Sequence, residues 1–249
     1  VSGEGSDTPD VAWARMRSTY YRGLLARGLA ASAESDDGLN PLMLGAVGST
    51  DNHLGTPGRV DEHGYWGSMS MIWATDEQRL GQAAYNPGGL VAVWAEQNTR
   101  GAVFDALHRR EAYATSGPRI SLRFGAASAD ACSHAEPPLS TVMGGELPRG
   151  TPPRFVVLAG QDRTALAAVD IVKATLVDGA PVESVTRIAE FPAGEASACI
   201  VWQDPAFDPE APAYWYTRVI EQPTPRWDRY LCERLESCSA ESAATRTVA

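Results

Sequence analysis

Two residues of the sequence, Asp51 and His53, have the types and the spacing of a metal-binding pair. An ionised carboxylate and a neutral imidazole are standard ligands of zinc, manganese and iron. In extended backbone, residues i and i+2 point to the same side, so both side chains could face one ion. A divalent metal held there would lower the pKa of a bound water and polarise a phosphoryl or carbonyl oxygen. The competing interpretation is an ordinary loop, with Asp51 in a turn and His53 on the surface.

Three residues farther along are candidates for a substrate-binding or secondary site. Glu62 and His63 follow the pair in a loop and could supply a ligand or a proton-transfer group, although a solvated loop cluster is the alternative. Glu96 ends an expected strand and could reach the site. Carboxylates near a helix start are, however, also ordinary partners of the helix dipole.

Thr115, Ser116 and Arg119 form a third group of candidates. They follow an expected helix, where a turn at a strand end would bring two hydroxyls and a guanidinium to an anionic substrate group. A Gly-Pro turn with a surface arginine is the alternative interpretation.

The first half of the chain shows elements that could position these residues. Apolar residues at spacings of three and four predict a helix over residues 9–35. The continuous apolar run over 42–48 predicts a buried parallel strand, and it ends directly before Asp51 and His53. A strand over 90–95 and a helix from Asn98 or Thr99 to about Glu111 follow, with Val103, Phe104 and Leu107 as the buried face of that helix. Polar groups at the C-terminal end of a buried strand are the layout of a β/α barrel.

After residue 120 the pattern changes to short β-branched or aromatic segments bounded by Gly, Pro and Asp. Asp178-Gly179, between two alternating runs, predicts a hairpin because both residues tolerate positive φ. The sequence therefore predicts an α/β part over 1–120 and an all-β, antiparallel sandwich-like domain over 121–249 with a C-terminal tail. The expected strands cover residues 121–124, 155–159, 170–177, 182–188, 199–202 and 214–221.

Composition narrows the class of protein. The net charge of -10 argues against a nucleic-acid partner, and no apolar run approaches the roughly 20 residues of a membrane span. Four cysteines, all in the second half, are compatible with two disulfides in any of three pairings, or with free thiols in the cytosol. We favour the oxidised form and an extracytoplasmic location. Arginine almost replaces lysine, as in bacterial proteins from high-GC genomes.

Several longer motifs resemble one family. GSTDNH at 48–53 resembles the last metal-binding motif of the PHP (polymerase and histidinol phosphatase-like) superfamily. The rest of the chain is similar to a branch of unassigned function, known as domain-of-unknown-function family 3604. The resemblance covers most of residues 10–235. It includes NPGGL at 86–90, VWAEQNTR at 93–100, RREAYATSGPRI at 109–120, MGGELP at 143–148, DIVK at 170–173 and PTPRW at 223–227.

The resemblance implies a metal-dependent hydrolase, often exported, that acts on a small anionic substrate, with a phosphoester as the expected class. It also implies that residues 1–120 are the C-terminal part of a distorted PHP-type β/α barrel. The sequence departs from that pattern because it lacks the His-x-His pair of the first barrel strand. One alternative is a non-catalytic binding or structural fragment without metal. Another is a scaffold that joins a missing N-terminal segment or a second copy, which would leave apolar barrel strands exposed.

Overall fold

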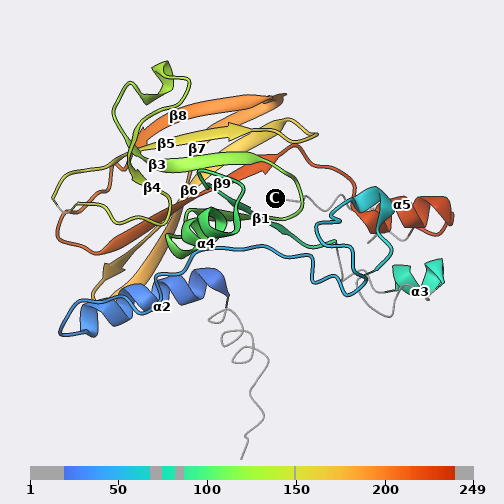
Figure 1. Cartoon of the computed structure of the whole chain (residues 1–249), viewed down its shortest axis with the longest axis horizontal. Helices are drawn as coiled ribbons and strands as arrows, with labels where there is room; N and C mark the ends of the chain where they lie inside the picture. The colour runs from blue at the N-terminus through green and yellow to red at the C-terminus, as the bar shows by residue number, and fades with distance from the viewer. Residues whose placement is uncertain (1–19, 68–74, 82–86, 149, 239–249) are drawn as a thin grey trace, which may run out of the picture.

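Antiparallel β-sheet dominates the computed structural model, which describes residues 20–67, 75–81, 87–148 and 150–238 (Figure 1). One sheet has the strand order β4-β3-β5-β8 and the other the order β7-β6-β9. The β-rich second half predicted from the sequence is thus confirmed. The first sheet consists of β3 (Ser121–Ala127), β4 (Leu139–Val142), β5 (Arg154–Gly160) and β8 (Ser197–Gln203), and the second of β6 (Leu166–Val177), β7 (Ala180–Glu195) and β9 (Ala213–Glu221).

The main hydrophobic core lies between the facing sheets. Phe124 of β3 stacks on Phe155 of β5, with ring centroids 5.3 Å apart. Val169 and Ile171 of β6 belong to the same buried cluster, and Trp215 of β9 packs against it. Every second residue of these strands faces inward, as expected for two stacked sheets.

The hairpin predicted at Asp178-Gly179 joins β6 to β7. Both residues have positive φ, 51° and 78°, and Val177 pairs with Ala180 across the two-residue turn. This is the connection in which a tight turn matches the twist of the flanking strands.

A buried carboxylate, Asp170, lies at the centre of the second sheet. Its side chain accepts hydrogen bonds from Arg187 on β7 at 2.6 Å and from Arg218 on β9 at 2.8 Å. Burial pushes the pKa of Asp170 upward, but the hydrogen bonds and charges of the two guanidiniums outweigh this, so the pKa lies below its ordinary value. The three residues are register partners and tie the strands together.

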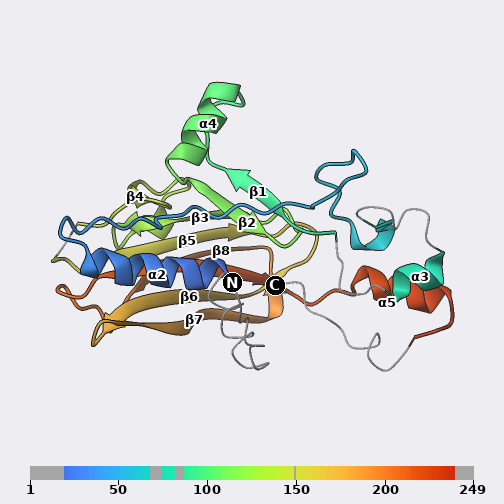
Figure 2. The same ribbon diagram turned by 90° about the horizontal axis from the view of Figure 1, so that it is seen from below.

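The first helix described, α2 (Tyr21–Glu34), confirms the later part of the predicted helix, whereas residues 9–19 lie outside the described ranges. The helix lies along the second sheet (Figure 2) and contacts β6 and β7. Arg22 forms an ion pair with Glu183 of β7.

The buried parallel strand predicted over 42–48 is wrong. This segment is irregular, and Val47 is 66% exposed. An apolar run becomes a strand only where a neighbouring strand satisfies its backbone, and none pairs with it among the described residues. The next strand, β1 (Leu90–Val93), is confirmed, and it pairs antiparallel with β2 (Ala112–Thr115).

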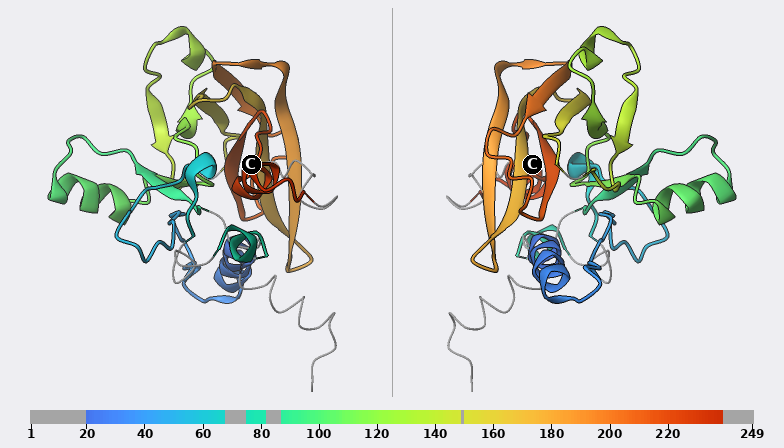
Figure 3. Two further views of the ribbon diagram at one scale, coloured as in Figure 1. Left: turned by 90° about the vertical axis from the view of Figure 1, so that its right-hand side faces the viewer. Right: turned by 90° about the vertical axis from the view of Figure 1, so that its left-hand side faces the viewer.

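The helix predicted after Thr99 is present as α4 (Arg100–His108), and the Thr99 side chain accepts a hydrogen bond from the Ala102 backbone N–H. Its predicted buried face is wrong: Phe104 is 64% exposed and Leu107 is 41% exposed. Only the small Ala106 is buried, because α4 projects away from the sheets (Figures 2 and 3) and meets the body of the protein through one narrow side.

Short helices gather at one end of the molecule (Figure 1). The C-terminal helix α5 (Trp227–Arg234) contacts the 3-10 turn η1 (Glu62–Gly64) and the helix α3 (Asp76–Leu80). A further 3-10 turn, η3 (Ala131–Ser133), lies beside β8. None of the helices in the described ranges is long and apolar enough to cross a membrane.

All four cysteines are paired, which confirms the expected two disulfides. Cys132 bonds to Cys199 and Cys232 to Cys238. Disulfides of this kind are typical of proteins from oxidising compartments.

Candidate functional site

Asp51 and His53 lie on an exposed loop. Their side chains are 87% and 52% exposed, and the Asp51 carboxylate lies 4.0 Å from the His53 Nδ1 atom. Asp51 has φ 49°, a left-handed conformation, so the extended geometry assumed from the sequence does not hold at this residue. The two side chains are nevertheless neighbours, because the loop turns back on itself.

A backbone contact sets the histidine's tautomer. His53 Nδ1 lies 2.9 Å from the Asp51 carbonyl oxygen, which can only accept a hydrogen bond. The proton of a neutral His53 ring therefore resides on Nδ1, and Nε2 carries the lone pair. An imidazole held in this way is prepared to coordinate a cation through Nε2.

The loop is positioned by the two glycines of the NPGGL motif at 86–90. Gly89 donates its backbone N–H to the Ser49 carbonyl at 2.9 Å. Gly88 has φ 79°, and a Cβ atom there would lie only 2.6 Å from the Thr50 Cα atom. The backbone of residues 88–89 thus packs directly against the residues before Asp51, an approach that only glycine permits.

The end of β2 and the turn after it lie close to the Asp51 loop. They carry Thr115, Ser116 and Arg119. Gly117, between them, lies beside the Gly88 carbonyl. The Arg119 guanidinium donates to the Gly58 carbonyl at 3.3 Å, and its backbone N–H donates to Asp162 at 2.9 Å. The side chains of Ser116 and Arg119 are exposed, and the Thr115 hydroxyl accepts a hydrogen bond from Gly117 N–H.

Glu62 and His63 belong to a different neighbourhood, beside α5. The Glu62 carboxylate accepts a hydrogen bond from the Trp227 backbone N–H at 2.8 Å, and burial raises its pKa. The His63 ring stacks on Tyr230, with centroids 4.6 Å apart.

Glu96 is exposed and lies beyond the C-terminal end of β1, whereas the Asp51 loop packs at the N-terminal end of that strand. The structure therefore does not bring Glu96 to Asp51 and His53.

In the part of the chain that the structure describes, no group of three or more His, Cys, Asp or Glu side chains is arranged to hold a metal ion. Asp51 and His53 have the right donor chemistry, but catalytic zinc sites use three protein ligands. A complete centre would need at least one further ligand.

Sequence reasoning missed α5 and its contacts with Glu62 and His63. Trp227 and Leu231, both buried, have the i, i+4 spacing of one helix face and were the available signal. The contact with Glu62 spans 165 positions, so no local pattern could have predicted it.

The molecule is thus a disulfide-bonded β-rich protein with an exposed Asp-His pair on a loop held by glycines. The model of one family, described as Protein of unknown function (DUF3604), matches residues 5–191 and 189–248. The chain belongs to this family. No curated protein and no solved structure matches it.

Proposed function

We propose that Asp51 and His53 are two ligands of a divalent-metal centre in a hydrolase of the PHP-like superfamily, with zinc, manganese or iron as the metal. In this proposal residues 1–120 belong to a PHP-type β/α barrel. The observation that carries it is the tautomer of His53: Nδ1 bonds the Asp51 carbonyl, which leaves the lone pair on Nε2 of a half-exposed ring whose Nδ1 atom lies 4.0 Å from the Asp51 carboxylate.

The substrate class we propose is a small phosphoester. A bound divalent metal would supply a Lewis acid and a water of lowered pKa. Arg119 would bind the anionic group of the substrate: its guanidinium is exposed, bonds the neutral Gly58 carbonyl and forms no ion pair with any described residue. Ser116, exposed on the same turn, would donate a hydroxyl to that group.

Metal content, measured by mass spectrometry on the purified protein, tests the proposal. Wild type should contain close to one equivalent of a transition metal, and an Asp51→Ala/His53→Ala variant should lose it. Asp105→Ala/His108→Ala on α4 is a matched control, because it removes another exposed Asp and His and should leave the metal content unchanged. Equal metal content in all three proteins would refute the assignment.

The alternative is a non-catalytic binding or structural module without metal. It is supported by apolar side chains at the surface of the first half: Val47, Val91 and Phe104 are 66%, 45% and 64% exposed. A further chain segment or a second copy of the protein would cover such residues. Light scattering separates the two: a concentration-dependent dimer without bound metal supports the alternative, and a metal-loaded monomer contradicts it.

We also propose that the protein works in the periplasm or outside the cell. The two disulfides support this location, because the cytosol keeps such thiols reduced.

A further inference from the structure

A cavity of about 500 Å³ opens where η1, α3 and α5 meet. It falls within the usual size range of small-molecule sites, roughly 300–1,000 Å³. Neither Asp51 nor His53 lines it. Its walls are rich in rings, which come from two segments far apart in the sequence: His63, Tyr65, Trp66, Trp227 and Tyr230.

The rings form a preformed aromatic surface. His63 stacks on Tyr230, and Tyr65 packs against Trp227 at a centroid distance of 5.0 Å. Trp66 remains 53% exposed although the Arg59 guanidinium lies over it, 4.8 Å from the ring centroid. Half-exposed aromatic rings at the rim of a cavity are typical of surfaces that bind the face of a ring-shaped ligand.

Two arginines line the cavity. Arg79 of α3 and Arg234 of α5 share one carboxylate, Asp76. The Nε atom of Arg79 is buried and has no hydrogen-bond acceptor among the described residues. A buried N–H without an acceptor costs free energy, and an anionic group entering the cavity would supply the missing acceptor.

Glu62 adds a hydrogen-bond acceptor to the same cavity. One of its carboxylate oxygens accepts the Trp227 backbone N–H. The remaining acceptor capacity of the carboxylate suits a hydroxyl donor.

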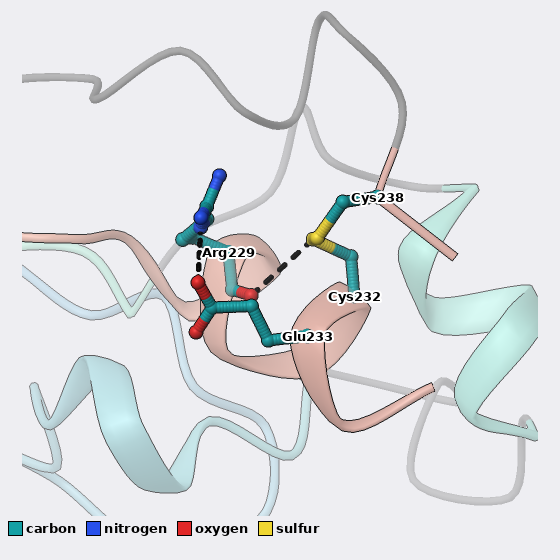
Figure 4. Close-up of a disulfide and its surroundings, with 4 residues drawn as sticks. All are labelled: Arg229, Cys232, Glu233 and Cys238. Carbon is teal, nitrogen blue, oxygen red and sulfur yellow. Dashed lines mark hydrogen bonds and ion pairs between the residues drawn. A yellow bond between two sulfur atoms is a disulfide. The ribbon is translucent and has the colours of Figure 1, made fainter. Parts of the chain in front are cut away.

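The walls are held by contacts independent of any ligand. The bond from Trp227 to Glu62 joins η1 to the first turn of α5. A disulfide from Cys232 to Cys238 closes the end of this helix (Figure 4). Trp227, Leu231 and Cys232 are buried. A helix fixed at both ends gives the preorganisation that binding sites need.

We propose that this cavity binds a small ring compound that carries a carboxylate and a hydroxyl group. The aromatic walls contact the ring, Arg79 and Arg234 bind the carboxylate, and Glu62 accepts the hydroxyl. A hydroxylated aromatic acid and a sugar acid share this chemistry. The inference does not depend on the proposed metal centre.

Titration of the full chain, followed by tryptophan fluorescence and calorimetry, tests the proposal. The probes are 4-hydroxybenzoate and glucuronate, each with a neutral partner, 4-hydroxybenzamide and glucose. At least one acid should bind in a 1:1 complex, and its neutral partner should bind at least about tenfold more weakly, as expected for loss of a charge-assisted hydrogen bond. The acid that binds identifies the ring class.

Variants separate the cavity from the rest of the protein. Arg79→Gln should weaken binding of the acid at least about tenfold, and Trp66→Ala, at an exposed position, should weaken it without affecting the fold. Arg229→Gln lies on the same helix but outside the cavity and should bind as wild type does, as should Asp51→Ala/His53→Ala. Circular dichroism checks that each variant is folded. The proposal is overturned if neither acid binds at millimolar concentration, or if folded Arg79→Gln and Trp66→Ala both bind with unchanged affinity.

Discussion

Replacing the disulfide between Cys132 and Cys199 by two serines should lower the free energy of unfolding by about 4 kcal/mol. The bond joins residues 67 positions apart. In the chain-entropy description, cross-linking removes about 2.1 + 1.5R ln n cal/mol/K of entropy from the unfolded chain, which for this loop is about 4.4 kcal/mol at 25 °C. Both cysteines are exposed, so lost packing contributes little to the change.

The second disulfide is the internal comparison. Cys232 and Cys238 are six positions apart, and the same relation gives about 2 kcal/mol. Because Cys232 is fully buried, its replacement by serine adds a packing cost that the first pair lacks.

Urea-induced unfolding of the oxidised wild type and of the two double variants measures these differences. A variant in which Cys132 and Cys199 are replaced should unfold at a much lower urea concentration. A loss within about 0.5 kcal/mol, the range of ordinary surface substitutions, would refute the reasoning, since it would mean that the bond does not stabilise the fold by lowering the entropy of the unfolded chain.

Two further substitutions test contacts described above. Asp170→Asn should cost about 2–4 kcal/mol at neutral pH, because it leaves two guanidiniums without their buried carboxylate. The pKa of Asp170 is lowered in the folded state, so its stabilisation is present above the unfolded pKa and is lost as pH falls through the folded one. Unfolding measured across the acid range should therefore depend less on pH in the variant, and an unchanged dependence would contradict this. Gly88→Ala should cost at least about 2 kcal/mol more than Gly55→Ala: both residues have positive φ, but only at Gly88 would the new Cβ meet backbone. Thermal unfolding compares them, and equal losses would count against the close approach.

Local signals explain what the sequence could predict. The hairpin at Asp178-Gly179 needs only two residues that accept positive φ between alternating runs, and both conditions are visible in the sequence. Six of the seven strands in the two sheets were also predicted from local patterns, but β4 was missed and the true lengths of the strands were not predicted. β7, for example, runs to Glu195, well past the predicted end at 188.

The structural predictions that were wrong concern features that depend on contacts with residues far away in the sequence. The apolar run over 42–48 has the composition of a buried strand, but strand formation needs a neighbour, which sequence periodicity cannot supply. The predicted buried face of α4 consisted of Val103, Phe104 and Leu107, whereas the residue that the helix buries is Ala106.

The candidate site was predicted only in part. The pairing of Asp51 with His53 rests on residues two positions apart and was accessible to sequence reasoning. The left-handed backbone at Asp51, the packing of Gly88 against Thr50 and the contacts of Glu62 with α5 all arise from tertiary structure.

The position of β7 at the edge of its sheet has a consequence for solubility. Most of its 16 residues are exposed, and among the described strands it pairs only with β6. An edge this long presents free N–H and C=O groups on which another molecule could add a strand and begin an aggregate. Pro181 and Pro192 cannot donate to such an added strand, and the charges of Glu183, Arg187 and Glu190 would have to be desolvated. These residues therefore protect the protein against self-association at high concentration.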